Sequence, residues 1–328
     1  MSRSRSIGAP APIERVSRRL VLVAPLVAAA FPARAQQVKI RLGTATPGGG
    51  FPVYGAAFVE GVCKADPGLE IEAINTKGST ENVPMLEAGT LDIALAQGEV
   101  VHESLQGIGR APADLKVVTA MYPTAGMFVV KADSPYRTIA DLKGKPIAWG
   151  AQGSGLVILG RYAMDGLGLD AARDFQPIYL ERAGDGPAMV LDGRAAALWG
   201  GGAGWPGFTT MSTAPGGARF VAPDEDQIAR ILMKHKFLKP VTQRAGSFPG
   251  QTTDIQSVGS WSFVLARPAL DETVAWRIAR ALHAAHAAGN APRQLVDTTA
   301  ANTVAVVPGR ERLHPGVARF YREIGLLA

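Results

Sequence analysis

The sequence feature that most constrains the fold is a short apolar strand pattern that stops at a glycine-rich loop and continues as a helix. Residues 38–42 alternate apolar and charged side chains, which is the period of a half-buried strand. The loop Gly43-Thr44-Ala45-Thr46-Pro47-Gly48-Gly49-Gly50 breaks that pattern, and residues 52–64 read as a helix with Pro52 in its first turn. The sequence therefore predicts a strand, a loop and a helix N-terminus in succession.

This junction has the geometry of an anion-binding site. Glycines let the backbone approach a ligand, while the unpaired N–H groups of the first helical turn and the positive end of the helix dipole point at it. No Lys-Ser/Thr pair follows the glycines and their spacing is not G-x-G-x-x-G, so the pattern is not that of a nucleotide site. A small carboxylate is favoured over a nucleotide. The alternative for this loop alone is an ordinary Gly/Pro turn ahead of a helix.

The same design occurs twice more. Residues 69–74 form a second alternating strand, and Lys77-Gly78-Ser79-Thr80-Glu81-Asn82 leads into a short helix that Ser79 or Thr80 is expected to cap. Residues 146–150 form a strand that ends at the loop Ala151-Gln152-Gly153-Ser154-Gly155, and a helix over 156–167 follows. Further strands are predicted at 91–97, 116–121, 126–131, 176–180, 195–199 and 257–267.

Strands that alternate with helices predict an α/β protein with mainly parallel sheets flanked by helices. Ligands of such sheets bind in the crevice beyond the carboxyl ends of the strands. We expect two lobes joined by a two-strand hinge: residues 36–125 with 258–328 form lobe 1, which is discontinuous, and residues 126–257 form lobe 2. Residues 208–257 carry the weakest pattern.

The first 35 residues are predicted to be a signal peptide. Arg18-Arg19 precede an apolar run over residues 20–31, and Ala33-Arg34-Ala35 supplies small residues for cleavage near Ala35. Both Sec and twin-arginine export fit this pattern. The run is shorter than the roughly 20 apolar residues that span a bilayer, so we expect an exported, soluble protein.

The charge balance argues against nucleic acid as a partner. The whole chain has a formal charge of +6, but residues 1–35 hold six arginines and one glutamate, which leaves +1 on the remainder. A nearly neutral mature chain lacks the electrostatic basis for binding a polyanion. Its single cysteine, Cys63, also excludes an internal disulfide.

Four segments, taken in their order along the chain, resemble the TAXI-type solute receptors (TRAP-associated extracytoplasmic immunogenic proteins). The resemblance runs from about Ile40 to the C-terminus, apart from residues 208–257. The segments are Gly43-Thr44 through Gly50-Phe51-Pro52-Val53-Tyr54-Gly55, residues 77–82 with 91–97, residues 139–145 with Gly153-Ser154-Gly155, and Leu313-His314-Pro315-Gly316 with Phe320-Tyr321-Arg322-Glu323.

This resemblance implies a periplasmic binding protein of the type II-like fold. Its two lobes would close on a small organic acid, such as glutamate or another dicarboxylate, and deliver it to the membrane subunits of a TRAP transporter. Two departures from the family pattern, in Thr44-Ala45-Thr46-Pro47 and in the glycine-rich run 200–204, border the expected cleft. The substrate can therefore differ from those of better-known family members.

The loops and the resemblance together define the predicted ligand site. Ser79 and Ser154 have helix capping as an alternative role, and Tyr54 and Trp205 can equally be core aromatics. Arg161 and Arg182 are weaker candidates for balancing the ligand charge, and we leave them outside the site. The predicted ligand-binding residues are Thr44, Thr46, Gly49, Gly50, Phe51, Tyr54, Ser79, Thr80, Gln97, Gln152, Ser154, Gly155 and Trp205.

Enzymatic signatures are weak by comparison. Ser154 does not sit in a G-x-S-x-G elbow, and His283 and His286 belong to no HExxH motif. We therefore expect no catalytic residue, no metal, no cofactor and a monomeric binding protein. The alternatives are a receptor that presents its ligand to a membrane sensor, and an enzyme on the same fold.

Overall fold

The structure is a computed structural model that describes Met1, Gly8 and residues 37–328. The predicted signal peptide and its cleavage position at Ala35 fall on residues 1–35, which are outside the described residues apart from Met1 and Gly8. Within the described part of the chain, no helix combines the length and the apolar character that crossing a membrane requires. Residues 37–328 belong to one compact unit.

The strands follow the alternating runs of the sequence, and glycine or proline loops separate them. They are β1 (Val38–Gly43), β2 (Leu69–Ile74), β3 (Ile93–Ala96), β4 (Lys116–Lys131), β5 (Pro146–Ala151), β6 (Gln176–Leu180), β7 (Ala197–Gly201), β8 (Ala218–Val221), β9 (Lys239–Gln243) and β10 (Ile255–Ala266).

Helices connect these strands and cover the sheet. The α-helices are α1 (Gly50–Ala65), α2 (Ser79–Glu87), α3 (Gly98–Gln106), α4 (Gly155–Gly166), α5 (Gly186–Leu191), α6 (Pro206–Thr213), α7 (Glu225–Lys234), α8 (Glu272–Ala287), α9 (Ala300–Val306) and α10 (Pro315–Glu323). Short 3₁₀ turns lie at Ala140–Leu142, Ala183–Asp185, Arg293–Leu295 and Arg310–Arg312.

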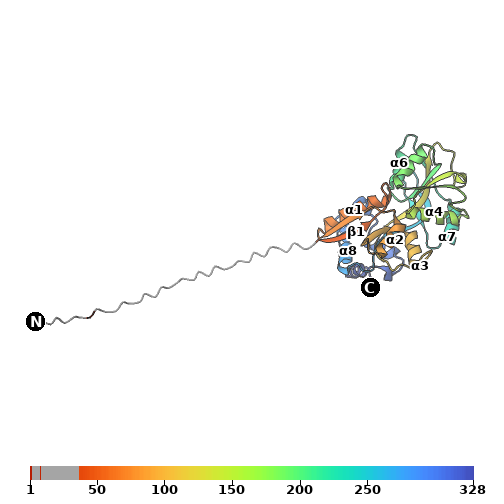
Figure 1. Cartoon of the computed structure of the whole chain (residues 1–328). Helices are drawn as coiled ribbons and strands as arrows, with labels where there is room; N and C mark the ends of the chain where they lie inside the picture. Colours follow the sequence, from red (N-terminus) through yellow and green to blue (C-terminus); the bar gives the residue numbers. More distant parts are fainter. Residues whose placement is uncertain (2–7, 9–36) are drawn as a thin grey trace. The chain divides into compact units, whose positions relative to one another are not determined.

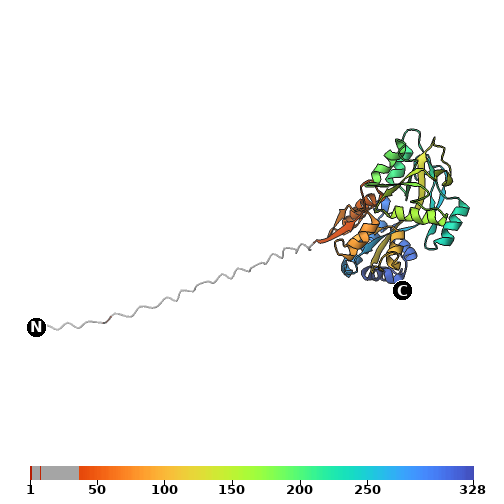
Figure 2. The same cartoon turned by 45° about the vertical axis from the view of Figure 1, so that its right-hand side comes forward.

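The main sheet has the strand order β2-β1-β3-β10-β4-β7-β5-β6, with β8 paired to β4 and β9 paired to β10. We call the part built on β1, β2 and β3 half A, and the part built on β5, β6, β7 and β8 half B. In Figures 1 and 2, α1, α2, α3 and α8 lie with half A, and α4, α6 and α7 lie with half B. The fold is thus α/β and two-lobed, as predicted.

Two long strands, β4 and β10, run through both halves. Near one end β10 pairs with β3 and belongs to half A, while its residue Val258 lies in the hydrophobic core of half B. The two strands are paired with each other where they cross, for example Gly259 opposite Ala125. The sheet is therefore mixed, and not mainly parallel as the sequence pattern predicted. The pairings of β1 with β2 and β3, and of β5 with β6 and β7, are parallel, whereas β4 and β10 run antiparallel to their neighbours.

The two separate strands expected at 116–121 and 126–131 are one strand of 16 residues. Pro123 suggests a break, because proline cannot donate a ladder hydrogen bond. In the structure Pro123 pairs with Trp261 next to a register shift of β10, and proline is tolerated at such irregularities. The weakly patterned residues 208–257 fold as α6, β8, α7 and β9.

The core of half B shows the two-residue period of its strands. Phe128 and Trp199 belong to one hydrophobic cluster with α4 and α7, whereas Met127 and Leu198 belong to a second cluster with α5 and α6. Helices therefore cover both faces of this part of the sheet.

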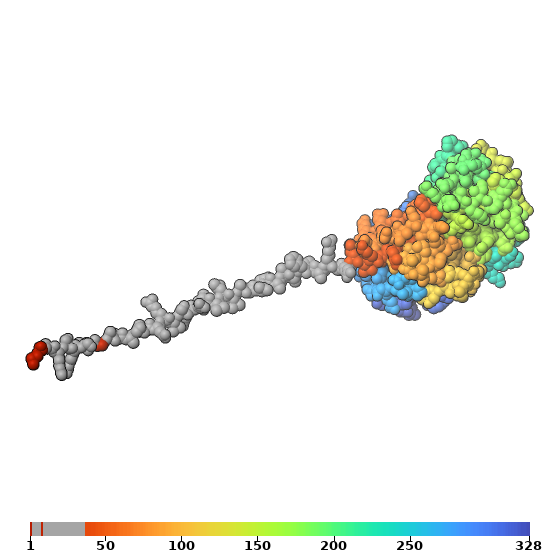
Figure 3. Space-filling view, in the orientation of Figure 1, coloured from red at the N-terminus to blue at the C-terminus, as the bar shows by residue number. Residues whose placement is uncertain are grey.

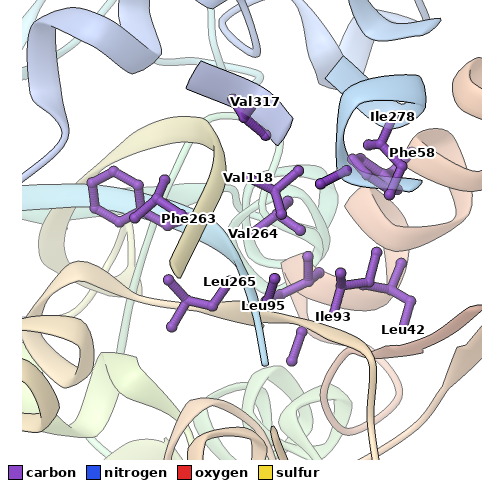
Figure 4. Close-up of a cluster of buried hydrophobic side chains, with 14 of the residues drawn as sticks. Leu42, Phe58, Ile93, Leu95, Val118, Phe263, Val264, Leu265, Ile278 and Val317 are labelled. Atoms are coloured by element: carbon purple, nitrogen blue, oxygen red, sulfur yellow. The ribbon is translucent and has the colours of Figure 1, made fainter. Parts of the chain in front are cut away.

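The core of half A is one cluster that joins the strands to α1, α2, α3, α8 and α10. Figure 4 shows Phe58 of α1 beside Ile278 of α8, with Leu42 and Ile93 of the sheet nearby. This packing fixes the direction of α1, and with it the position of the glycine loop at its start.

Candidate functional site

A small cavity lies where the loops of the two halves meet. Its volume is about 40 Å³, and since one buried water needs roughly 10–15 Å³ on this scale, there is room for about three waters. The lining residues are Ala45, Thr46, Gly49, Gly50, Phe51, Lys77, Gly78, Ser79, Gln97, Tyr122, Thr124, Ala151, Ser154, Gly155, Leu156, Ala183, Gly201 and Trp205.

Five helix N-termini border this cavity. The lining includes the first residues of α1, α2 and α4, and also Gln97 and Trp205, which are the N-cap residues of α3 and α6. First-turn amides have no acceptor within their own helix, and each helix adds a partial positive charge at this end. None of the lining residues, all of which fall within 37–328, is acidic. The cavity therefore has the electrostatic character of an anion site.

Glycine is required where the two halves come closest. Gly48 has φ +82°, and a Cβ there would lie 2.4 Å from the Cα of Gly184. Gly78 has φ +117°, and a Cβ there would lie 2.8 Å from the carbonyl oxygen of Gly153. Side chains at these positions would be strained in conformation and would push the halves apart.

Direct hydrogen bonds join the halves around the cavity. The backbone N–H and the hydroxyl of Thr80 both donate to the Gly153 carbonyl, at 3.2 and 3.1 Å. On the other side, the Ala183 N–H donates to the Thr46 hydroxyl at 3.1 Å. On the face shown in Figure 3 the surfaces of the two halves meet directly. The structure is thus a closed arrangement.

Several polar groups of the lining remain available to a guest molecule. The Gln97 amide nitrogen is buried and has no hydrogen-bond partner in the described part of the chain. Burial raises the pKa of the Tyr122 phenol, which therefore stays neutral and can donate a hydrogen bond. Lys77 adds a cationic side chain at the rim, since it is exposed as well as lining the cavity.

The two predicted capping serines have different roles. Ser154 is the N-cap of α4, and its hydroxyl accepts from the Leu156 N–H at 3.2 Å. Ser79 does not cap α2, and neither does Thr80, because the N-cap is Gly78 without a side-chain hydrogen bond. The Ser79 hydroxyl instead accepts from the Gln97 N–H at 3.1 Å, and so ties α2 to the start of α3.

Nine of the thirteen predicted ligand-binding residues line the cavity and four do not. The nine are Thr46, Gly49, Gly50, Phe51, Ser79, Gln97, Ser154, Gly155 and Trp205. Thr44 is buried beneath the loop, where its hydroxyl donates to the Ile74 carbonyl at 2.9 Å. Tyr54 is a core residue whose hydroxyl bonds to that of Thr298 at 2.9 Å. Thr80 bridges the halves through its bonds to the Gly153 carbonyl, and Gln152 is exposed.

Sequence reasoning missed other lining residues, most clearly Tyr122 and Thr124. Both lie on β4, near the point where it crosses between the halves. The only sequence signal was the interruption of an apolar run at Tyr122-Pro123, which suggested a strand end at the same sheet edge. Neither weaker arginine candidate lines the cavity: Arg161 pairs with Glu103 and Arg182 is exposed.

The described residues contain no group of three or more His, Cys, Asp or Glu side chains placed to hold a metal ion. His314 caps α10 by accepting from the Gly316 N–H at 3.3 Å, and its other ring nitrogen lies 3.1 Å from the Leu270 carbonyl oxygen. Burial lowers its pKa, so it serves as a neutral structural residue that docks the last helix.

The arrangement of strands, helices and cavity defines the type II fold of periplasmic binding proteins. Among solved structures, Tv2483 bound to L-arginine has a TM-score of 0.53 at 13% identity, over 80% of this chain and 91% of that one. The chain belongs to the NMT1-like family, which matches residues 42–325.

Two further structures are similar at lower TM-scores. The alkanesulfonate-binding protein SsuA from Xanthomonas axonopodis pv. citri, bound to MOPS, is 21% identical over 88% of this chain and 84% of its own, with a TM-score of 0.47. A TctC solute-binding protein from Polaromonas is 17% identical over 89% of this chain and 99% of its own, with a TM-score of 0.49.

Proposed function

We propose that this protein is a solute-binding protein that holds a small organic anion in the cavity between its two halves. The convergence of five helix N-termini on an enclosed space without acidic lining carries this proposal. A carboxylate there gains hydrogen bonds to backbone amides in a low-dielectric setting, where charge-assisted bonds are strongest.

The size and polarity of the cavity narrow the class of ligand. In the closed arrangement the cavity has room for about three waters, which admits an acid about the size of acetate and is too little for a nucleotide or a lipid. Tyr122, Thr124 and Gln97 offer neutral donors, and Lys77 offers a positive charge. We infer that small carboxylates are favoured, and that a dicarboxylate or an amino acid such as glutamate binds with the two halves further apart than in this arrangement.

Closure of the halves is the proposed event. We assign residues 36–125 with 258–328 to one lobe and 126–257 to the other, with β4 and β10 as the hinge. An anion that contacts amides of α1 and α2 on one side and of α4 on the other interacts with both lobes only when they are closed. Its differential contacts therefore shift the population toward the closed state.

The proposed partner is the membrane part of a TRAP-type transporter, to which the closed protein delivers the acid in the periplasm. The ordered resemblance of the four segments to TAXI receptors supports this assignment. It also supports export by the segment 1–35, and the protein is proposed to act as a monomer.

A thermal-shift and calorimetric screen of the mature protein tests the proposal. The panel comprises acetate, pyruvate, succinate, 2-oxoglutarate and L-glutamate. Succinamide, the uncharged isostere of succinate, is the control. One or more anions should raise the melting temperature and bind saturably, because a ligand of the native state stabilises it by mass action, whereas succinamide should not.

Failure of every anion to bind would contradict the proposal, as would equal binding of succinate and succinamide. Recovery of the bound anion without a new product after prolonged incubation separates a binding protein from an enzyme on this fold.

A further inference from the structure

A cluster of buried polar side chains lies behind the cavity. The Glu99 cluster consists of Gln97, Glu99 and Ser260, all of which are buried. The carboxylate oxygens of Glu99 and the Ser260 hydroxyl make no hydrogen bond of regular geometry in the described part of the chain, although Ser260 and Gln97 lie close enough to the carboxyl group to lower its pKa. A buried carboxylate without a cation or a well-formed hydrogen bond is costly, so its presence here needs a physical explanation.

The cluster is held between the start of α3 and strand β10. Gly98 approaches β10 so closely that a Cβ on it would lie 2.3 Å from the Ser260 hydroxyl oxygen and 2.4 Å from the Trp261 carbonyl oxygen. Gln97 reaches the other way, to the cavity, where a Cβ on Gly155 would lie 3.1 Å from its amide oxygen. The Gln97 amide also lowers the pKa of the Glu99 carboxyl, so this one side chain adjoins both the cavity and the buried carboxyl group.

No cation neutralises Glu99 among the described residues. On its own helix, His102 stacks on Phe237 and burial lowers its pKa, so it is neutral. Glu103, one turn further on, is paired with Arg161 of α4. The charged residues of the packed helix α2 are Glu81 and Glu87, of which Glu87 pairs with Arg110. Strand β10 contributes only hydroxyl groups here, and Lys239 of β9 lines an adjoining groove beside Gly98.

A metal cation is a poor occupant of this cluster, because the N-terminus of α3 carries partial positive charge at the same place. A proton on the Glu99 carboxyl group is a better way to neutralise the buried charge. Burial and, to a smaller extent, the neighbouring Glu103 together raise the pKa of the Glu99 carboxyl to about 7, against the opposing effects of the Ser260 hydroxyl and the Gln97 amide. The carboxyl therefore exchanges its proton close to neutral pH.

We propose that Glu99 takes up a proton when a small anion enters the cavity, so that anion binding and proton binding are coupled through Gln97. This inference rests on the proposed function of the cavity. The bound anion and an ionised Glu99 would lie on either side of the Gln97 amide. Because this region is buried, solvent would screen their repulsion only weakly. Protonation of Glu99 from solvent removes this repulsion and leaves both Gln97 amide hydrogens free for the guest.

Calorimetric titration of the whole mature protein with succinate and with pyruvate tests the coupling. Both probes are ionised between pH 6.5 and 8.5, and triethanolamine and Tris are amine buffers that do not compete as anions. The difference in heat between the two buffers gives the number of protons taken up. We expect uptake that approaches one proton per bound anion at pH 8, and an affinity that weakens by up to about tenfold from pH 7 to pH 8.

The variant Glu99→Gln keeps the shape of the side chain and should bind the same probes with no proton uptake and with a nearly constant affinity over this range. Glu60→Gln removes an exposed carboxylate from α1 and should behave as the wild type. Ser260→Ala removes a group that lowers the pKa of Glu99, so its affinity profile should shift to higher pH. Ser260→Ala keeps the test decisive if Glu99→Gln folds poorly.

Anion binding without proton uptake in the wild type would overturn the coupling and leave the solute-binding function intact. Uptake that persists in Glu99→Gln would also overturn it. Absence of anion binding in the wild type would instead overturn the proposed function, and the coupling with it.

Discussion

The two sides of the cavity are built differently. Half A presents the N-termini of α1, α2 and α3 and the side chains of Lys77, Ser79 and Gln97. Half B presents the N-termini of α4 and α6 and, beyond them, mostly small or apolar groups such as Ala183, Gly201 and Trp205. The comparison suggests a division of work: half A recognises charge, while half B closes over the guest and excludes water. Changes on the two sides should therefore have different signatures.

The largest effect is expected from Trp205→Ala, which removes the wall that half B contributes. Trp205 is 4% exposed and packs edge-to-face on Phe208 with ring centroids 4.9 Å apart. Truncation of a buried aromatic side chain should lower the free energy of unfolding by about 3–5 kcal/mol. Urea denaturation of the wild type and the variant measures this loss in the free energy of unfolding. Trp205→Phe should retain most of that stability. A loss below about 1 kcal/mol for the alanine variant would show that the wall is not part of the core.

The second largest effect is a pH dependence of stability that arises from Glu99 in half A. Its pKa is raised from 4.5 to about 7 in the folded protein. The folded state therefore binds the proton more tightly than the unfolded state does, and the free energy of unfolding falls as pH rises from about 4.5 through 7. The fall amounts to about 3 kcal/mol.

Glu99→Gln should lack this decline and be more stable than the wild type at pH 8. Denaturation series at pH 5 and pH 8 measure the effect, with Glu60→Gln as a matched loss of an exposed carboxylate. Parallel pH profiles of wild type and Glu99→Gln would contradict the interpretation.

A smaller effect tests the contact between the two sides. Gly155→Ala places a Cβ 2.4 Å from the Cβ of Gln97, whereas Gly184→Ala places one 3.4 Å from the Cα of Gly48, an ordinary contact across the same boundary. Overpacking costs about 1–3 kcal/mol, so Gly155→Ala should weaken anion binding by about 10- to 100-fold. Gly184→Ala should bind normally. Equal affinities of the two variants would mean that binding does not need the closed arrangement.

The smallest effects separate the two serines. Ser154→Ala removes the cap of α4 and should lower stability by about 1 kcal/mol. Ser79→Ala leaves the Gln97 N–H without its acceptor and should cost about 1 kcal/mol or more, with an additional loss of anion affinity because Gln97 is displaced. Chemical denaturation and titration of both variants check this. A Ser154→Ala variant with the larger loss of affinity would reverse the assignment of recognition to half A.

Much of the fold could be predicted from local sequence patterns. The junctions at Gly49, Ser79 and Gly155 were visible because glycine, hydroxyl residues and a change of hydrophobic period occur together there. The continuity of β4 through Pro123 was not visible, because the register shift that accommodates this proline lies on β10, more than 130 residues away. A proline usually interrupts a strand. In β4 the pairing with β10 allows the strand to continue through Pro123.

The candidate site shows the same limit. Tyr122 and Thr124 sit within what reads as a core strand, and Ala183 and Gly201 reach the cavity only through contacts between the halves. Glu99 resembles an ordinary acidic residue in a first helical turn, since its burial against β10 is a long-range property. The assignment of the thirteen predicted residues to ligand binding stays a prediction, although nine of them share one cavity.

The most direct test of the account is a crystal structure of the mature protein with the anion that binds most tightly in the screen. We predict density for that anion between the halves, within hydrogen-bond distance of amides from the first turns of α1, α2 and α4. An anion held by one half alone, or bound outside this cavity while the cavity contains only water, would contradict an anion site shared by the two halves.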